Sequence, residues 1–544
     1  ALLTSWLVAV TFTPMLGVAL LREPRKDQQH SHEAQYQGTL YRRFRMLVQH
    51  CVRYRKSVVL LTVAAFVLAL VGMQTLVQKQ FFPSSDRPEV LVDIYLPEGS
   101  SAQQTDALAR RIEARLQEHP DVVSLSSFVG AGAPRFFLSL NPEQPNPAFA
   151  KVIAIAADAA GRDRLIAELR AQVAAGEYPE ARVRVHRLLF GPPVTWPVSF
   201  RVLGPDPLQV RRIAEQVKGV MQAHPHTVDA HLDWNERVPA VRLALDAERL
   251  RAIGLTPREL SSQLQLHWGG VPVTQLRQDV RSVQLVLRGT RGSIEDFADL
   301  PLRTSDGRTV TLAQAGLIEL VSEDPVLRRY NRQPFIQVQA DIQGAQPPDV
   351  TWALWRDLQP LREQLPAGYH LDIGGSVERS GKAQESLRKV QPIMIGLMLV
   401  IIMLQMRSFS GTLMVLATAP LGVIGAVLAL IVGNQPFGFV ALLGMTGLAG
   451  ILMRNTLILT KQIDDNLENG MPRLESLVEA TVQRARPVLL TALAAALAFV
   501  PLTLDAFWGP LAWVLIGGTL IGTLITLLFL PALYALWFRV AAQR

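Results

Sequence analysis

Long apolar runs dominate the pattern of hydrophobic and polar positions along this 544-residue chain. They cover Leu2 to Leu21, Ser57 to Val77, Val390 to Met406, Gly411 to Gly433, Phe437 to Thr460, Val488 to Leu504 and Leu511 to Phe538. A helix of roughly 17 to 25 residues crosses the hydrocarbon core of a bilayer, which is about 30 Å thick. The pattern therefore predicts seven transmembrane helices.

The spacing of these runs predicts a membrane bundle that is interrupted by a large insertion. Two runs come first, about 300 residues without such a run follow, and five more lie almost end to end. The chain opens with Ala1 at the edge of an apolar run, without the charged region that begins a signal peptide. We therefore interpret the sequence as a piece from inside a larger protein.

Composition supports membrane insertion, and the charged residues predict its orientation. Hydrophobic residues make up 49% of the chain and charged residues 18%, which is too apolar for an ordinary soluble protein. The connections that carry Lys and Arg are 22–56, the turn at Arg407, 461–486 and the tail 539–544, whereas 433–436 and 505–509 carry none. Basic and uncharged connections alternate, so the basic ones are expected in the cytoplasm and the large insertion outside.

The basic excess, with a pI near 9.8, is thus explained by topology, and no nucleic-acid-binding motif competes with that explanation. Within 22–56, basic residues alternate with apolar ones at roughly helical spacing: Tyr41, Phe44, Met46, Leu47 and Val52. This pattern predicts an amphipathic helix on the cytoplasmic membrane surface, with an ordinary basic linker as the alternative. Cys51 is the single cysteine, which excludes an intrachain disulfide.

The insertion contains an internal repeat of the order strand, helix, strand, strand. The first copy runs from Leu91 to Phe128 and continues into FFLSL at 136–140; the second runs from Val198 to Trp234 and continues into VPAVRLAL at 238–245. Each copy is completed by a further strand, helix and strand: 151–157, 163–173 and 183–188 in the first, and 334–342, 350–365 and 369–374 in the second. Two split βαβ subdomains are predicted, each with two helices on one face of a sheet.

Several stretches together resemble the carboxy-terminal half of a resistance-nodulation-division (RND) efflux permease of the hydrophobe or amphiphile (multidrug) type. They are FFPSSDRPEVLVDIYLPEGSS, HWGG at 267–270, RRYNRQP at 328–334, APLGVIGAV at 419–427, and GMTGLAGILMRNTLIL followed by RARPVLLTALA. Their order and spacing match over nearly the whole chain. The fold class expected is a polytopic α-helical membrane protein with a large periplasmic α+β insertion.

The resemblance implies a division into named parts. They are a transmembrane helix (1–21), a cytoplasmic amphipathic linker (22–56), a second transmembrane helix (57–77), a periplasmic porter subdomain (78–197), a second porter subdomain in two parts (198–245 and 319–385), a docking subdomain (246–318), a bundle of five transmembrane helices (386–538) and a cytoplasmic tail (539–544).

The resemblance also implies a homotrimeric, proton-driven exporter in the bacterial inner membrane, joined by a periplasmic adaptor and an outer-membrane channel. An amino-terminal half would supply about five more spans, a second pair of porter subdomains and the acidic pair that accepts protons. None of the seven apolar runs contains Asp or Glu, Asp505 being in a turn. We therefore expect this piece alone to complete no transport cycle. No enzyme activity, cofactor or resident metal is expected.

Arg454 interrupts the run from Phe437 to Thr460. Gly447 and Gly450 precede it by seven and four residues on one helical face, where small residues allow a neighbouring helix to approach. We expect the guanidinium to point into the bundle, with snorkelling to the cytoplasmic interface as the alternative. In the family a cation here, usually Lys, pairs with acids of the other half; Arg remains charged, so it would act as counter-ion rather than proton carrier.

Three further polar residues match or adjoin the family's relay positions: Asn455, Arg484 and Thr491. Arg484 and Thr491 are seven residues apart and share a helical face. For Thr491 the alternative is a hydrogen bond to the backbone of its own helix, which is common for Thr in a membrane span.

Candidate cargo contacts flank a loop of small residues at 129–134: Phe128 before it, and Phe136 and Phe137 after it. Alternation along a strand would send only one of Phe136 and Phe137 to a given face, so at least one is expected in the core, with Phe137 the weaker candidate for cargo. Aromatic side chains beside a flexible loop would suit an apolar cargo.

The class of cargo is inferred from the absence of methionine in part of the insertion. Copper or silver export would call for thioether ligands, yet no Met lies between Met73 and Met221, and His224, His226 and His231 read as a surface loop. We therefore expect amphiphilic organic cargo such as drugs, dyes or detergents. The alternatives are an RND exporter of metals or lipids, and a membrane-anchored periplasmic binding or scaffold module that transports nothing. No P-loop is present to suggest nucleotide hydrolysis.

Overall fold

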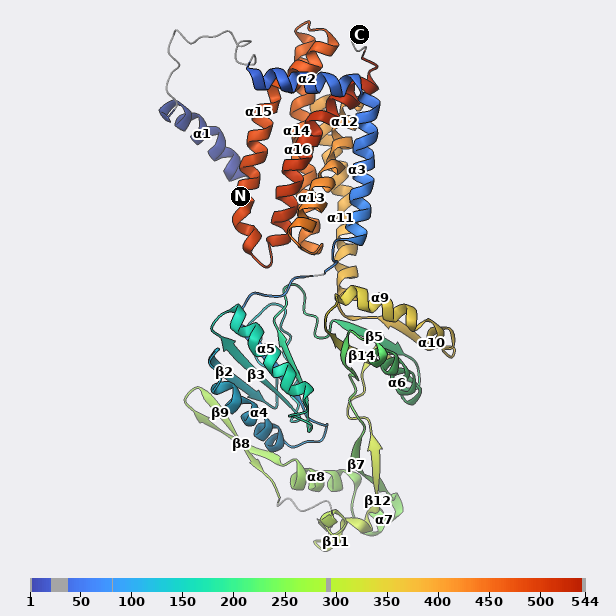
Figure 1. Cartoon of the computed structure of the whole chain (residues 1–544). Helices are drawn as coiled ribbons and strands as arrows, with labels where there is room; N and C mark the ends of the chain where they lie inside the picture. Colours follow the sequence, from blue (N-terminus) through green and yellow to red (C-terminus); the bar gives the residue numbers. More distant parts are fainter. Residues whose placement is uncertain (1, 21–37, 81, 290–294, 541–544) are drawn as a thin grey trace.

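The computed structural model describes residues 2–20, 38–80, 82–289 and 295–540. A bundle of long helices stands above a large α+β portion, and α11 runs from one into the other (Figure 1). Within the described part, six helical segments are long and apolar enough to cross a membrane: α3 (Arg55–Thr75), α11 (Gly375–Met406), α12 to α13 (Phe409–Val432), α14 (Phe439–Glu468), α15 with η6 (Arg473–Leu504) and α16 (Gly509–Trp537).

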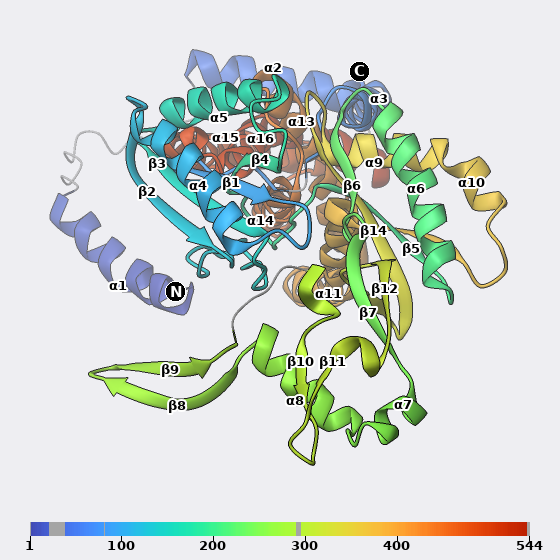
Figure 2. The ribbon, with the colours of Figure 1, turned by 90° about the horizontal axis from the view of Figure 1, so that it is seen from below.

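The first apolar run also forms a helix, α1 (Leu2–Leu20), which stands apart from the other helices in Figure 2. Its described apolar stretch, Leu7–Leu20, is shorter than the six membrane-length segments. The amphipathic helix expected in the linker is α2 (Thr39–Arg53), and it lies across the end of the bundle that is farther from the α+β portion.

The bundle is packed around α16, which contacts α13, α14 and α15. Small residues allow α13 (Gly422–Val432) to approach closely: a Cβ added at Gly425 would lie 2.3 Å from the carbonyl oxygen of Gly517. Before α13, the segment breaks into the 3₁₀ turn η5 (Ala419–Leu421), where Pro420 cannot donate a backbone hydrogen bond. The predicted fourth run is therefore two helices, α12 (Phe409–Thr418) and α13, rather than one.

The first subdomain has the order β1 (Glu89–Tyr95), α4 (Ala102–Gln117), β2 (Val122–Val129), β3 (Phe149–Ala156), α5 (Ala159–Ala174) and β4 (Arg182–Arg187). Its antiparallel sheet has the order β2-β3-β1-β4, and both helices cover the face formed by Val90, Val92 and Ile94. The strand predicted for FFLSL is wrong. Those residues form a turn in which Leu140 N donates to Phe137 O, and the third strand is β3, beginning nine residues after Leu140.

The second subdomain repeats this arrangement with β5 (Val198–Leu203), α6 (Pro207–Ala223), β6 (Thr227–Leu232), β14 (Gln333–Ile342), α9 (Pro347–Asp357), α10 (Gln359–Glu363) and β15 (His370–Ile373). The sheet order is β6-β14-β5-β15, and β13 (Arg329–Tyr330) adds to β14. VPAVRLAL is a strand, β7 (Val238–Leu245), but it leaves this sheet and pairs with β12 (Gly316–Glu323). The second and third strands of this sheet in chain order are therefore β6 and β14, which are far apart in sequence.

The ribbon of β7 and β12 carries a third unit at the far end of the molecule. It contains α7 (Ala247–Ala252), α8 (Pro257–Trp268), the hairpin of β8 (Val271–Gln278) and β9 (Arg281–Leu287), η3 (Glu295–Phe297), β10 (Pro301–Arg303), β11 (Thr309–Thr311) and η4 (Leu312–Gln314). Helix α8 begins at a capping box formed by Thr256 and Glu259. Leu250, Leu260 and Leu302 form its small core, and the exposed hairpin extends away from the rest of the chain (Figure 2).

Candidate functional site

Arg454 lies on a face of α14 that no described element covers. Its side chain is exposed, and a Cβ added at Gly447 or Gly450 would meet nothing within 4 Å. The opposite face of α14 is buried in the bundle through Leu448 and Leu452. The guanidinium does not point into the bundle formed by the described helices, and its orientation toward helices of the other half stays a prediction. Because the α14 helix turns its other face to α16, Arg454 points outward along a stripe of small residues.

Among the described residues, Arg454 takes part in no ion pair. Asn455 points the other way: it is buried, and its Nδ2 lies 3.5 Å from Thr523 Oγ1 on α16. One residue of helix corresponds to a rotation of about 100°, so adjacent residues face different neighbours. The side chains of Asn455 and Arg454 therefore point in different directions, one into the bundle and one outward.

Arg484 and Thr491 lie on α15. The Arg484 Nε donates to Gln462 Oε1 at 2.9 Å, which joins α15 to α14 eight residues beyond Arg454. Thr491 is exposed, and its hydroxyl donates to the carbonyl oxygens of Pro487 (3.0 Å) and Val488 (2.9 Å) in its own helix. This is the backbone hydrogen bond that is the alternative to a relay role for Thr491.

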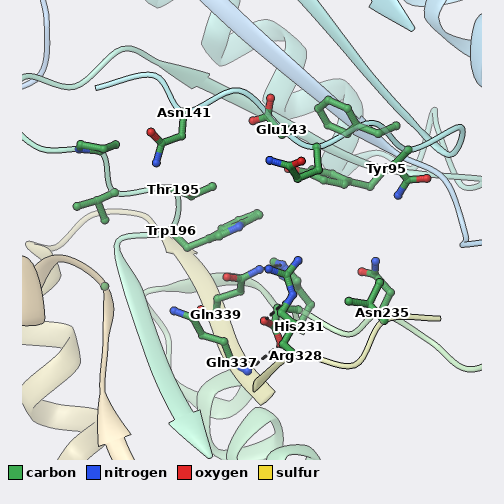
Figure 3. A pocket seen from close by; sticks show the side chains of 18 of the residues that line it. Tyr95, Asn141, Glu143, Thr195, Trp196, His231, Asn235, Arg328, Gln337 and Gln339 are labelled. Carbon is green, nitrogen blue, oxygen red and sulfur yellow. Dashed lines mark hydrogen bonds and ion pairs between the residues drawn. The ribbon is translucent and has the colours of Figure 1, made fainter. Parts of the chain in front are cut away.

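A cavity of about 750 Å³ lies between the two α/β subdomains. Figure 3 shows Tyr95, Asn141 and Glu143 along one wall and His231, Gln337 and Gln339 along the other. Charged side chains of both signs line it: Glu98, Glu143, Asp233, Glu378, Arg182, Arg201, Arg328 and Arg379. The described residues contain no cluster of three or more His, Cys, Asp or Glu side chains with metal-site geometry. The cavity is therefore a polar cleft rather than a preformed metal cage.

The carboxylates of this cleft are held by neighbouring donors. Glu98 Oε1 accepts from Asn146 Nδ2 at 3.0 Å and from Asn235 Nδ2 at 2.8 Å, so it bridges the two subdomains. Arg201 binds Glu378 at 3.0 Å, and Arg328 lies 3.4 Å from Asp233.

Burial raises the pKa of Asp233 to about 6. The hydrogen bond from the Gln337 backbone N–H and the positive charge of Arg328 both act to lower this pKa, but their effect is smaller. Desolvation disfavours the charged carboxylate, and the partners compensate only in part. Asp233 therefore changes charge near pH 6.

A layer of buried charges underlies one wall of the cleft. The Lys151 ammonium is 1% exposed and lies 3.1 Å from Asp93 and 2.8 Å from Glu143. His186 Nε2 lies 3.0 Å from the second oxygen of Asp93. Burial acts to raise the pKa of Asp93, but His186, Lys151 and Arg184 together hold it well below its ordinary value. This layer fixes the loop that carries Glu143 against the sheet.

Two arginines of β4 connect this layer to the second subdomain. Arg184 Nε lies 2.9 Å from Asp341 Oδ2 on β14, and its guanidinium lies 4.0 Å from the ring centroid of Trp196. Arg182 Nε lies 3.4 Å from Asp229 Oδ1 on β6. Residues two apart in a strand share a face, so both side chains project toward the same neighbour. We name Arg182, Arg184, Asp229 and Asp341 the arginine clamp.

The three candidate cargo phenylalanines lie outside the residues that line this cavity. Phe128 is half-buried on β2, and Phe136 is 43% exposed in the loop that follows. Phe137 packs against the cluster of Leu91, Leu140 and Leu188. Sequence reasoning missed the cleft charges because they come from separate segments between residues 98 and 379, and no local spacing connects them.

Residues 1–538 match the model of the AcrB/AcrD/AcrF family. The chain belongs to this family of RND permeases. Members of this family are transport proteins rather than enzymes. The family and the six membrane-length helical segments of the described residues make this chain a multi-pass protein of the inner membrane with a large periplasmic portion. The predicted fold class is confirmed.

Two relatives and one solved structure match almost the whole chain. The cobalt-zinc-cadmium resistance protein CzcA of Cupriavidus metallidurans is 24% identical over 99% of this chain and 52% of its own length. The nickel-cobalt-cadmium resistance protein NccA of Alcaligenes xylosoxydans xylosoxydans is 25% identical over 99% of this chain and 51% of its own. The crystal structure of a heavy metal efflux pump has a TM-score of 0.74 at 22% identity, covering 92% of this chain and 52% of that one. This chain spans about half the length of these proteins.

Proposed function

We propose that this chain is half of a proton-driven exporter of divalent heavy-metal cations. The observation that supports this most strongly is its similarity over 99% of its length to two relatives named for cobalt, zinc, cadmium or nickel resistance. These relatives favour the metal-exporting alternative over the amphiphilic cargo that we preferred from the sequence. The complete protein would act as a homotrimer with a periplasmic adaptor and an outer-membrane channel.

The chemistry of the cleft supports divalent cations of intermediate softness. Carboxylates, amides and His231 supply oxygen and nitrogen ligands, while no thioether lies between Met73 and Met221. Such ligands suit zinc, cobalt or nickel better than monovalent copper or silver. A cation entering the cleft would replace an arginine or amide at Glu98 or Asp233. Competition of this kind keeps binding weak enough for release, which a transport site requires.

Arg454 supports proton coupling. It is a permanent cation on an uncovered stripe of α14, where a helix of the other half would pack against Gly447 and Gly450. A carboxylate pair on that helix would find its counter-ion in Arg454. Protonation of the pair would weaken the attraction and let the helices shift.

Amphiphilic cargo remains a second candidate because Phe136 is 43% exposed beside a loop of small residues. Exposure of a large apolar side chain is an ordinary feature of protein surfaces, so it supports this candidate less than the relatives support metals.

The test uses the complete protein with its adaptor and channel in a metal-sensitive host. Glu98→Gln and Asp233→Asn should each reduce tolerance to zinc, cobalt or cadmium about tenfold and leave dye accumulation unchanged. Glu118→Gln, at an exposed position at the end of α4, is the matched control. Loss of dye efflux with normal metal tolerance would instead favour the amphiphilic candidate.

A further inference from the structure

Helix α2 presents two different surfaces. Its inner surface packs on α15 and α16 through Val48, Cys51 and Val52. Arg45 anchors it there, because its Nη2 lies 2.9 Å from Glu479 Oε2 on α15. In Figure 1 the helix lies across the bundle end opposite the periplasmic portion, which is the cytoplasmic end. Its outer surface therefore lies at the level of the inner-leaflet headgroups.

The outer surface is strongly cationic. Arg42, Arg43 and Arg53 on α2, and Lys56 just beyond it, are exposed, and among the described residues none of them forms an ion pair. No acidic residue occurs anywhere in 38–80. These four cations, which we call the α2 cation face, have no protein counter-charge in the described part of the chain.

An apolar stripe borders the α2 cation face. Leu40, Leu47 and Tyr54 follow one another at intervals of seven residues, which places them on one side of the helix. Their side chains are 78%, 46% and 49% exposed. A soluble anion would neutralise the cations but leave this stripe in water. A phospholipid satisfies both, since its phosphate meets the cations and its acyl chains cover the stripe.

We propose that α2 binds anionic phospholipids of the cytoplasmic leaflet, with the α2 cation face on the phosphates and Leu40, Leu47 and Tyr54 against the acyl chains. This site is independent of the cargo and of the proton-coupling residues. Arg42 and Arg43 lie near the start of the helix and Arg53 and Lys56 at and beyond its end, so two headgroups about 15 Å apart can be held at once, at 1.5 Å per residue.

The test measures lipid retention by native mass spectrometry of the complete protein, purified from membranes and re-equilibrated with phosphatidylglycerol or phosphatidylcholine. The unaltered protein should retain several-fold more phosphatidylglycerol than phosphatidylcholine. R42Q/R43Q and R53Q/K56Q should each reduce phosphatidylglycerol retention at least threefold. R258Q/R281Q removes two exposed arginines of the periplasmic portion and should change nothing. R42K/R43K should retain the lipid, which separates loss of charge from misfolding.

Three results would overturn the proposal. Equal retention of the two lipids by the unaltered protein would remove the requirement for negative charge. An equal loss in R258Q/R281Q would show a general effect of charge on the protein. Displacement of phosphatidylglycerol by millimolar inorganic phosphate would mark the α2 cation face as a site for soluble anions.

Discussion

A single charged residue, Arg454, carries the coupling hypothesis. A cation at the centre of a membrane span costs from about 3 to more than 10 kcal/mol unless it finds partners or water. In this chain the guanidinium is exposed on the uncovered stripe of α14, and its neighbour Asn455 is turned away from it into the bundle. The residue is therefore placed to meet a partner outside the described elements rather than to stabilise this half.

If Arg454 is a counter-ion, its charge matters more than its shape. Arg454→Lys should keep appreciable export because Lys presents a cation, although it loses the planar fork. Arg454→Met should abolish export while membrane abundance stays normal, since the removed group is not a packing element here. Transport rate and abundance measured side by side check this. Normal export by the Met variant at equal abundance would support snorkelling instead.

Phe136 and Phe137 should respond differently to truncation. Phe137→Ala removes a ring that packs on Leu91, Leu140 and Leu188, so we expect the free energy of unfolding to fall by about 2 kcal/mol. Phe136→Ala removes a side chain that is 43% exposed and should change stability little. Thermal unfolding of both variants compares them directly. If Phe136→Ala proves the more destabilising, the loop packs differently from this structure.

At the scale of elements, side chains of β4 connect the first subdomain to the second and make their contact sensitive to pH. The arginine clamp joins strand β4 to β6 and β14. The pKa values of its two aspartates shift in opposite directions. Burial raises the pKa of Asp229 to about 6, opposed by Arg182 and Arg184 and assisted by Asp341. Burial also acts to raise the pKa of Asp341, but Arg184 lowers it overall.

The sign of the effect on stability follows from linkage. Folded Asp229 holds a proton up to about pH 6, whereas the unfolded group releases it near 3.8, so its contribution to stability is present at low pH and lost as pH rises through 6. Asp229→Asn should therefore raise the melting temperature more at pH 7.5 than at pH 5. Asn also tolerates the positive φ of 53° at this position.

Asp341→Asn is the matched control for this experiment. Its pKa is lowered in the folded protein, so the carboxylate is charged at both pH 5 and pH 7.5, and its loss leaves Arg184 buried without its partner. The melting temperature should fall by a similar amount at both pH values. An equal response of the two variants at both pH values would contradict the assignment of Asp229 as the titrating member of the clamp.

At the scale of the whole molecule, the described bundle contains both a closed helix interface and an open helix face. Gly425 and Gly517 lie in the closed interface between α13 and α16. A Cβ added at Gly425 would lie 2.3 Å from the carbonyl oxygen of Gly517, and one added at Gly517 would lie 2.3 Å from Ala429 Cβ. Gly447 and Gly450 lie on the open face. An apolar groove beside that face is lined by Leu416, Ala419, Pro420, Val423, Met445, Leu448 and Ala449. We expect the other half of the permease to cover it.

Bulky substitutions distinguish the two faces. Gly425→Leu should prevent this half from folding and lower its abundance in the membrane, because the helices cannot separate without losing their packing. Gly447→Leu should leave this half folded but block its close approach to the other half, so the protein should be present and inactive. Abundance and transport measured for both variants check the prediction. Normal transport by Gly447→Leu would place the interface with the other half elsewhere.

The sequence by itself determined the properties that depend on local pattern. Apolar runs of membrane length specify helices whatever their neighbours are, and the alternation of basic and uncharged connections specifies their orientation. Likewise the order of strands and helices specified two split βαβ subdomains, and the ordered motifs specified the family.

Tertiary structure alone decided which strands pair and where charged side chains point. FFLSL and β3 are both apolar enough to form a strand, and long-range pairing with β1 selects β3. In the same way Asp93, Arg184 and Asp341 meet only because the sheets bring distant segments together, and Arg454 faces outward because α16 takes the other side of its helix.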